Sequence, residues 1–353
     1  MAAAGLTVRA LELGTPEPAS DAPGGDAPAA PTPLTAAALE PGVDPRPPAD
    51  NQRWTVDLST RLEIDDDTGE PAATQAVGLD LHRVVTDAGG DRATIVLQAY
   101  LIRLDNQPRR AAFFEGDDDW ELNWRIFNVN LHLAPRGALS LRVGHLELPF
   151  GLEWPVNTNG TLRNFANGAN TGLKADWGAS LNGMADDLDY EVALTRGSGN
   201  GWHDTGDPWL ASGRLGWRVD PDLRLGVSGL VGRPNPAAAD DPARWARAGV
   251  DVTRDLGPLT LRAEASGGET AGAAAFHGLG EVGWRDRSER WFVYGQIRHF
   301  DRAPRPTTAA LGLRYTPDRH WALSAEVLKP VRGGGGNAGA EAALFRTQLR
   351  YRF

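Results

Sequence analysis

The sequence predicts an all-β protein: a transmembrane antiparallel up-and-down β-barrel of about 16 strands, preceded by a disordered N-terminal segment. Three observations support this prediction. Polar and apolar residues alternate with a period of two in successive runs from about residue 51 onward. Short turns and longer loops join these runs in alternation. No window reaches the roughly 18 uninterrupted apolar residues that a membrane-spanning helix requires.

Residues 1–50 are rich in Ala and Pro and carry more acidic than basic side chains. Such a segment cannot bury enough apolar surface to offset the entropy lost on ordering, so we expect a disordered or extended leader. Met1 is followed by neither a basic stretch nor an apolar core, and we therefore expect no secretory signal to be visible here. Whether this start is native stays open. The barrel is expected to occupy 51–353.

The first strand shows the period-two pattern clearly. Between Trp54 and Ile64 one phase is mainly apolar and the other is polar, which is typical of a strand with one face toward lipid and one toward water. Most of the runs reach the roughly 9–11 residues that a tilted strand needs to cross a bilayer. Further strands are expected at 73–86, 91–104, 120–133, 138–149, 171–184, 187–196, 209–219, 222–232, 244–254, 257–267, 273–285, 290–300, 306–316, 320–330 and 341–353.

The connections are expected to alternate in length. Short ones with turn chemistry are 87–90, 134–137, 185–186, 220–221, 255–256 and 317–319. Longer ones are 65–72, 105–119, 150–170, 197–208, 233–243, 301–305 and 331–340. This arrangement predicts a membrane barrel with both termini on the short-turn side.

The last strand fixes which face points inward. Its two faces carry Phe345, Thr347, Leu349, Tyr351 and Phe353 on one side, and Arg346, Gln348, Arg350 and Arg352 on the other. An arginine facing lipid near the bilayer midplane costs about 2–4 kcal/mol, so the arginine face must line the lumen. The same rule turns Leu173, Trp177 and Leu181 outward. The expected channel-lining residues are Arg142, Lys174, Asp176, Arg214, Arg262, Arg298, Arg314, Arg346, Arg350 and Arg352.

Charges of both signs predict an interior filled by water or by polar networks, not a packed core, because unpaired charges away from water are prohibitively costly. A barrel of about sixteen strands also has room for an aqueous channel. Aromatic residues near strand ends are expected either to form girdles at the membrane interfaces or, as the alternative, to be ordinary packed aromatics. The candidates are Trp54, Trp120, Trp217, Trp291, Trp321 and Tyr351.

Several classes of chemistry find no support in the sequence. There is no cysteine, which excludes disulfides and thiolate chemistry, and the 7 histidines have no metal-ligand spacing. No nucleophile motif is present, so we expect no catalytic residues, metal site or cofactor. The acidic runs 65–67 and 117–119 are expected to be solvated, with weak divalent-cation binding as the alternative. A net charge of −10 without a basic cluster argues against nucleic acid as a partner.

Residues 141–153, Leu-Arg-Val-Gly-His-Leu-Glu-Leu-Pro-Phe-Gly-Leu-Glu, resemble the RVGxxxxPFGLE stretch of the phosphate-selective porin O and P family. The segments 176–183, 188–194 and 197–201 are similar to the same family. The final strand, ending in Tyr351, Arg352 and Phe353, resembles the terminal strand of bacterial outer-membrane proteins. There it is read by the barrel-assembly machinery, which implies that Tyr351 and Phe353 form the assembly signal.

The resemblance implies a homotrimeric porin of the bacterial outer membrane, in contact with lipid and lipopolysaccharide, with loop three folded into the lumen. Loop three maps onto 150–170, where the expected constriction residues are Glu153, Asn157, Asn159, Arg163 and Asn164. The family implies phosphate or anion selectivity. Its lysine cluster is missing, however, since 150–170 has no Lys and Arg163 as its one Arg. The asparagines of the loop would suit neutral or zwitterionic solutes, although asparagine also simply favours loops, and both solute preferences stay open.

The leading functional hypothesis is passive diffusion of small polar or anionic solutes through a water-filled pore. The first alternative is an outer-membrane barrel hydrolase with its site at the extracellular rim. The second is a soluble all-β binding protein with a sandwich architecture, which would require an apolar interior.

Overall fold

The structure is a computed structural model, and it describes residues 51–65, 69–87, 90–106, 119–158, 160–165, 167–301, 307–332 and 342–353. The expected leader, 1–50, lies outside the described residues. So do Asn159 and the larger part of both acidic runs.

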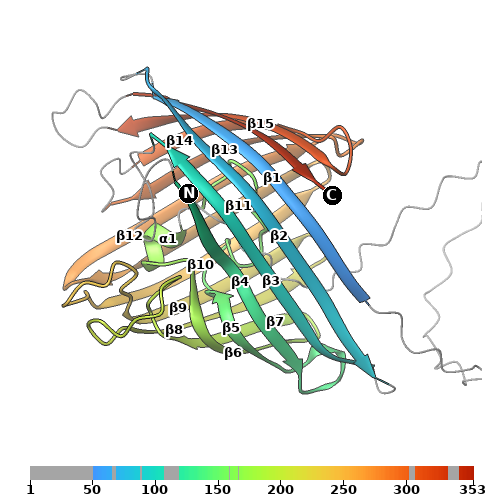
Figure 1. Cartoon of the computed structure of the whole chain (residues 1–353), viewed down its shortest axis with the longest axis vertical. Helices are drawn as coiled ribbons and strands as arrows, with labels where there is room; N and C mark the ends of the chain where they lie inside the picture. Colours follow the sequence, from blue (N-terminus) through green and yellow to red (C-terminus); the bar gives the residue numbers. More distant parts are fainter. Residues whose placement is uncertain are drawn as a thin grey trace, which may run out of the picture. The chain divides into compact units, whose positions relative to one another are not determined.

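Within the described residues the chain forms a closed antiparallel barrel of 16 strands, which confirms the predicted fold class. Figure 1 shows the strands lying obliquely side by side, with the first strand (blue) beside the last ones (red). The strands are β1 (Asn51–Asp65), β2 (Pro71–Asp87), β3 (Gly90–Asp105), β4 (Trp120–His132), β5 (Ser140–Glu147), β6 (Ala175–Ala185), β7 (Leu188–Thr195), β8 (Trp209–Asp220), β9 (Leu223–Arg233), β10 (Trp245–Leu256), β11 (Leu259–Thr270), β12 (Ala273–Arg285), β13 (Trp291–Phe300), β14 (Thr307–Tyr315), β15 (Trp321–Arg332) and β16 (Leu344–Arg352).

The barrel closes between its first and last strands. β1 pairs with β16 over a register that runs from Asp57 opposite Arg352 to Asp65 opposite Leu344. Beyond β16, Phe353 donates its N–H to the carbonyl of Val56 at 3.1 Å and accepts from the Val56 N–H at 2.8 Å. Every strand therefore has two hydrogen-bonded neighbours, which is what a sheet in a hydrocarbon environment requires.

The connections that follow even-numbered strands have at most seven residues, and we call this end of the barrel the short-turn end. Turns there are stabilised by carboxylates: Asp318 accepts the backbone N–H groups of His320 and Trp321 at 2.7 and 3.0 Å. These two hydrogen bonds lower the pKa of Asp318, because they stabilise its charged form.

The opposite end, which we call the long-loop end, carries the longest connections but does not follow the expected alternation everywhere. β11 and β12 are joined there by a turn of two residues, Ala271 and Gly272, both with positive φ (53° and 78°). This geometry is typical of the tight hairpin turns that match strand twist. The alternation of short and long connections was therefore wrong at this position.

The outer face is apolar along the strands. On β7, the side chains of Val192 and Leu194 are 63% and 64% exposed. Glu191, the residue before Val192, points to the inner side and is fully buried. Five of the six expected girdle residues, all except Tyr351, are exposed. Trp291 stacks on Tyr315 with ring centroids 4.3 Å apart, and Trp321 lies against Tyr351 in a tilted arrangement with centroids 4.6 Å apart. Among the described residues, no helix is long and apolar enough to cross a membrane.

The inner side contains more apolar packing than the sequence suggested. Leu173, expected to face outward, lies inside the barrel in a cluster with Leu148, Phe150, Leu210 and Leu230. The expectation was wrong because Leu173 precedes β6 and belongs to a loop that folds into the lumen, where strand alternation does not apply. The interior is thus a polar network with small apolar clusters inside it.

Topology can be tested by cysteine labelling, since the chain contains no cysteine. Asp204→Cys lies at the long-loop end and Asp222→Cys at the short-turn end. We expect an impermeant thiol reagent to modify Asp204→Cys on intact cells and Asp222→Cys only after the cells are broken, because long loops face outward in such barrels. The opposite labelling pattern would show that the chain is inserted the other way around.

The role of the last residue can be tested by deleting Phe353. This residue is 57% exposed and extends the β1–β16 pairing. We expect a lower yield of folded barrel, measured by heat-modifiable migration in detergent, with nearly unchanged conductance of the channels that do form. Normal yield together with altered conductance would contradict an assembly role.

Candidate functional site

The connection between β5 and β6 is the segment most involved with the lumen. It runs from Leu148 to Lys174, longer than the expected 150–170, and contains the short helix α1 (Asn167–Thr171). The expected strands 138–149 and 171–184 were correspondingly too long at these ends. The irregular Leu-Pro-Phe-Gly sequence ends β5 early, since Pro149 lacks the N–H that a strand ladder needs. We call residues 148–174 loop three.

Loop three starts with two backbone contacts to the inner wall. The N–H of Gly151 donates to the hydroxyl of Ser228 on β9 at 3.0 Å, and the N–H of Leu152 donates to Glu264 on β11 at 2.7 Å. Gly151 has a φ of 58°, and a Cβ at this position would overlap the Glu264 carboxylate. Glycine is therefore needed here both for the left-handed conformation and for the close approach.

The middle of loop three reaches strands far from β5 and β6. Arg163 donates to Glu281 on β12 at 2.9 Å. Arg298 on β13 donates to the carbonyl of Asn164 at 3.1 Å, and Arg346 on β16 donates to that of Leu162 at 3.3 Å. Together with the first contacts, these bonds attach the loop to the inner wall from β9 to β16.

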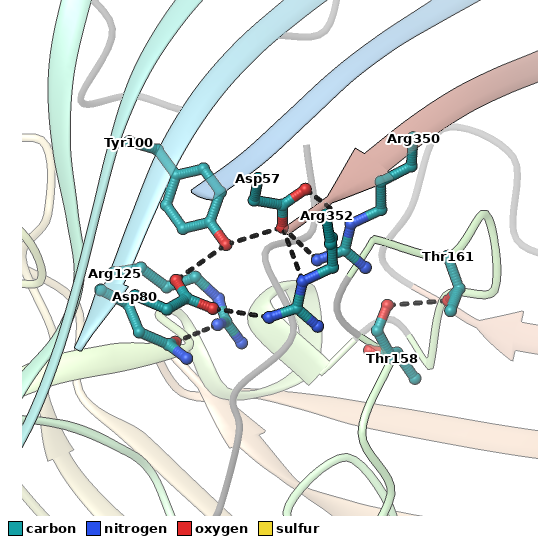
Figure 2. Close-up of polar contacts among 9 residues, drawn as sticks. Asp57, Asp80, Tyr100, Arg125, Thr158, Thr161, Arg350 and Arg352 are labelled. Carbon is teal, nitrogen blue, oxygen red and sulfur yellow. Dashed lines mark hydrogen bonds and ion pairs between the residues drawn. The ribbon is translucent and has the colours of Figure 1, made fainter. Parts of the chain in front are cut away.

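Gly160 permits the closest approach to β16. Its φ is 61°, and a Cβ would overlap the guanidinium of Arg350. Figure 2 shows the loop residues Thr158 and Thr161 near Arg350, with the hydroxyl of Thr161 donating to the Thr158 carbonyl at 2.7 Å.

Apolar contacts fix the loop as well. One cluster joins Leu148, Phe150 and Leu173 to Leu210 and Leu230 of the wall. A second cluster joins Leu152 and Phe165 to Leu279 on β12. Burying one such side chain stabilises a structure by about 1.5–3 kcal/mol, so these clusters hold the loop against the wall more strongly than an exposed ion pair would.

The two charged constriction candidates of loop three are both paired. Glu153 is 1% exposed and forms an ion pair with Lys174 at the other end of the loop. Arg163 shares the Glu281 carboxylate with Arg262, at 2.9 and 2.7 Å. Of the amide candidates, Asn157 lines the cavity described below, and Asn164 contributes its backbone carbonyl to Arg298.

Arginines near the barrel closure form a charge cluster with two aspartates (Figure 2). Asp57 on β1 forms an ion pair with Arg350, and Asp80 on β2 forms one with Arg352 at 2.9 Å. The hydroxyl of Tyr100 on β3 lies 3.1 Å from Asp57 and 3.2 Å from Asp80. This cluster ties β1, β2, β3 and β16 together on the inner side.

Most other channel-lining candidates also face inward and have partners. Arg142 donates to Glu191 at 2.9 Å, and Arg214 lies between Asp251 and Asp189 at 2.7 and 3.2 Å. Asp176 is fully buried and accepts the backbone N–H groups of Gly197 and Gly199. It therefore positions the β7–β8 connection.

Arg314 on β14 differs from these residues. Within the part of the chain that the structure describes, its guanidinium has no hydrogen-bond acceptor or carboxylate partner, and its Nε is buried. Strand register places it next to Phe292 on β13, which in turn lies next to Arg285 on β12. On its other side Arg314 lies next to Ser324 on β15.

This row of four inward residues lines a cavity of about 300 Å³ below loop three. The sequence reasoning identified Arg314 but missed Arg285, Phe292 and Ser324. The sequence did contain a signal for this row. Counting residues outward from the two turns that join β12, β13 and β14 places Arg285, Phe292 and Arg314 side by side on the inward-facing side of the sheet.

The described residues hold no group of three or more His, Asp or Glu side chains that is arranged to hold a metal ion. The serine and histidine that come closest to a catalytic pair are Ser140 and His132, 3.2 Å apart. The other ring nitrogen of His132 faces the hydroxyl of Thr94 at 3.2 Å instead of a carboxylate, so this pair is not part of a Ser-His-acid arrangement.

No model of a known protein family matches the chain, and no curated protein matches its sequence. Solved structures do match. A triple mutant of the Rhodopseudomonas blastica porin superposes with a TM-score of 0.55 at 11% identity, covering 86% of this chain and 100% of that one. A loop L8 deletion mutant of OmpT, an outer-membrane protein of Vibrio cholerae, gives 0.56 at 14% identity with the same coverage.

These likenesses concern the fold. The resemblance to the phosphate-selective family, and the trimer that it implies, stay predictions. The chain has the 16-stranded barrel fold of bacterial outer-membrane porins.

Proposed function

We propose that the protein is an outer-membrane channel for passive diffusion of small polar or ionic solutes, with loop three as its constriction. The observation that carries the proposal is the attachment of this loop across the lumen, from Ser228 on β9 to Arg346 on β16. A loop that starts between β5 and β6 and is bonded to strands as far away as β16 narrows the barrel, whose diameter would otherwise leave a wide aqueous passage. No turnover is involved.

A preference for anions is part of the proposal. Around loop three two arginines, Arg163 and Arg262, share the single carboxylate of Glu281. Arg298 donates to a backbone carbonyl and Arg314 has no acceptor among the described residues. Among these groups positive charge exceeds negative charge, and low-dielectric walls strengthen its field.

The lysine cluster of phosphate specialists is missing from loop three, where Lys174 is the one lysine and is paired with Glu153. We therefore propose a general preference for small anions without specialisation for phosphate. The hydrolase alternative gains no specific support, because the Ser140–His132 pair lacks an acidic partner.

Shortening loop three tests the constriction. Replacing residues 156–168 with a short Gly-Ser linker removes the Arg163, Leu162 and Asn164 contacts to β12, β16 and β13. We expect single-channel conductance in planar bilayers to rise, since the narrowest part of the pore is gone. Heat-modifiable migration serves as the folding control, and a folded variant with parental conductance would show that the constriction lies elsewhere.

The source of ion preference is tested by Arg163→Gln. Reversal potentials in a KCl gradient should move toward cation selectivity, and the change should be larger at low salt, because the screening length grows from about 10 Å at 0.1 M to about 30 Å at 0.01 M. Arg92→Gln, an exposed arginine at the β2–β3 turn, is the matched control and should leave the potential unchanged. Equal shifts for both variants would argue against loop three as the selective element.

A further inference from the structure

The cavity below loop three lies at the short-turn end of the inner wall, between the loop and strands β12 to β15. Its volume is about 300 Å³, at the lower end of the range for pockets that bind small organic molecules. Arginines contribute to it from three directions: Arg163 from loop three, Arg285 and Arg290 from the β12–β13 region, and Arg314 from β14. Glu289 is the one acidic residue in its lining.

Arg314 carries an electrostatic cost that the chain itself does not relieve. Its Nε is buried without a partner, and the guanidinium groups of Arg163, Arg285 and Arg350 are close enough to repel it. Arg314 as a whole is half-buried, and moving part of a charge out of water without a counter-ion is costly, whereas a carboxylate can accept two parallel N–H bonds from one guanidinium. The cavity in front of Arg314 therefore favours an anion.

Phe292 positions the other guanidinium groups. The carbon at the centre of the Arg163 guanidinium lies 5.1 Å from the centroid of the Phe292 ring, and that of Arg285 lies 5.6 Å away. Both are within the range of cation–π attraction. A Cβ on Gly283 of β12 would lie 2.9 Å from the Phe292 ring, so glycine makes room for the ring against the wall.

The rest of the lining suits an organic body. Apolar surface comes from Leu162 and from the rings of Phe292 and Tyr294, and hydroxyl groups come from Thr161, Thr316 and Ser324. An inorganic anion such as phosphate would occupy a small part of this volume and leave the aromatic surface facing water. A ring-sized molecule would cover it and gain hydrophobic stabilisation.

We propose that this cavity is a binding site for an organic carboxylate with a body of about one six-membered ring, taken up on its way through the pore. The proposal deepens the channel function proposed above and rests on it for its biological role. Arg314 binds the carboxylate, Phe292 positions Arg163 and Arg285 around it, and the hydroxyls contact the body. Binding is weak, as conduction requires that a solute enter a site and leave it again.

The test uses the full chain folded as a barrel in planar bilayers with KCl. Benzoate, glucuronate, acetate and phosphate are added in turn, and the concentration that halves the chloride current is measured for each. We expect benzoate or glucuronate to act at a lower concentration than acetate and phosphate. The comparison of benzoate with glucuronate shows whether the site prefers an aromatic or a hydroxylated ring, and either result supports the site.

Variants assign the effect to named residues. Arg314→Gln should weaken the block by benzoate or glucuronate by about tenfold or more, the effect expected for losing a charge-assisted hydrogen bond. Phe292→Leu should reduce the preference for ring-sized carboxylates over acetate. Arg218→Gln is the matched control, since it removes an exposed arginine of β8 that is not part of the cavity lining.

Two results would overturn the site: a block by phosphate as strong as that by both ring-sized carboxylates, or an unchanged block in Arg314→Gln. Folding of each variant is checked by heat-modifiable migration, and Phe292→Leu provides a second reading if Arg314→Gln does not fold. Calorimetric titration of the detergent-folded barrel separates the two proposals. If carboxylate binding depends on Arg314 but the barrel has no conductance, the channel function is wrong and the binding site stands. If the barrel conducts but shows no such binding, the binding site is wrong and the channel function stands.

Discussion

The closed ring of backbone hydrogen bonds is the constraint on which the rest of this structure depends. A strand edge in hydrocarbon would leave N–H and C=O groups without partners, at several kcal/mol each. Pairing of β1 with β16, continued by Phe353 and Val56, removes that edge. Once the ring is closed, the period of two sends alternate side chains to lipid and to the lumen, so the apolar outer face and the charged inner face have one cause.

The charged inner face in turn determines how loop three is held. Carboxylates on the wall, such as Glu264 and Glu281, need donors, and loop three supplies the Leu152 N–H and the Arg163 guanidinium. Arginines on the wall need acceptors, and the loop supplies the carbonyls of Leu162 and Asn164. Loop three and the wall therefore supply hydrogen-bond partners to each other. This explains how a segment with little secondary structure can lie inside a barrel. Leucine and phenylalanine clusters add the apolar part of that attachment.

Arg314 is one place where this mutual satisfaction is incomplete. Its row neighbours Phe292 and Ser324 offer it no negative charge, and Arg163, the one charged loop-three residue in the cavity lining, has the same sign. Polar groups buried in proteins are normally hydrogen-bonded, so an unsatisfied guanidinium beside a cavity points to something that passes through or binds there. In a channel, such a group acts on solutes without any covalent chemistry.

Much of the barrel could be predicted from local pattern. Strands such as β8 and β12 lie within one residue of their expected bounds, because alternation of polar and apolar side chains is a property of neighbouring residues. Pattern failed where the chain leaves the sheet. Leu173 was assigned to a strand face although it belongs to loop three, and the two-residue turn at Ala271 and Gly272 was not identified.

The sequence by itself determined the fold class, the strand positions and the inward phase of residues such as Arg346 and Arg350, since these follow from period and from the cost of a charge in lipid. Only the tertiary structure decided which charges meet. Arg350 pairs with Asp57 across 293 positions of sequence, and Arg163 meets Glu281 across 118. Such contacts depend on barrel closure and on the path of loop three, and no local pattern encodes the path of a segment that is not a strand.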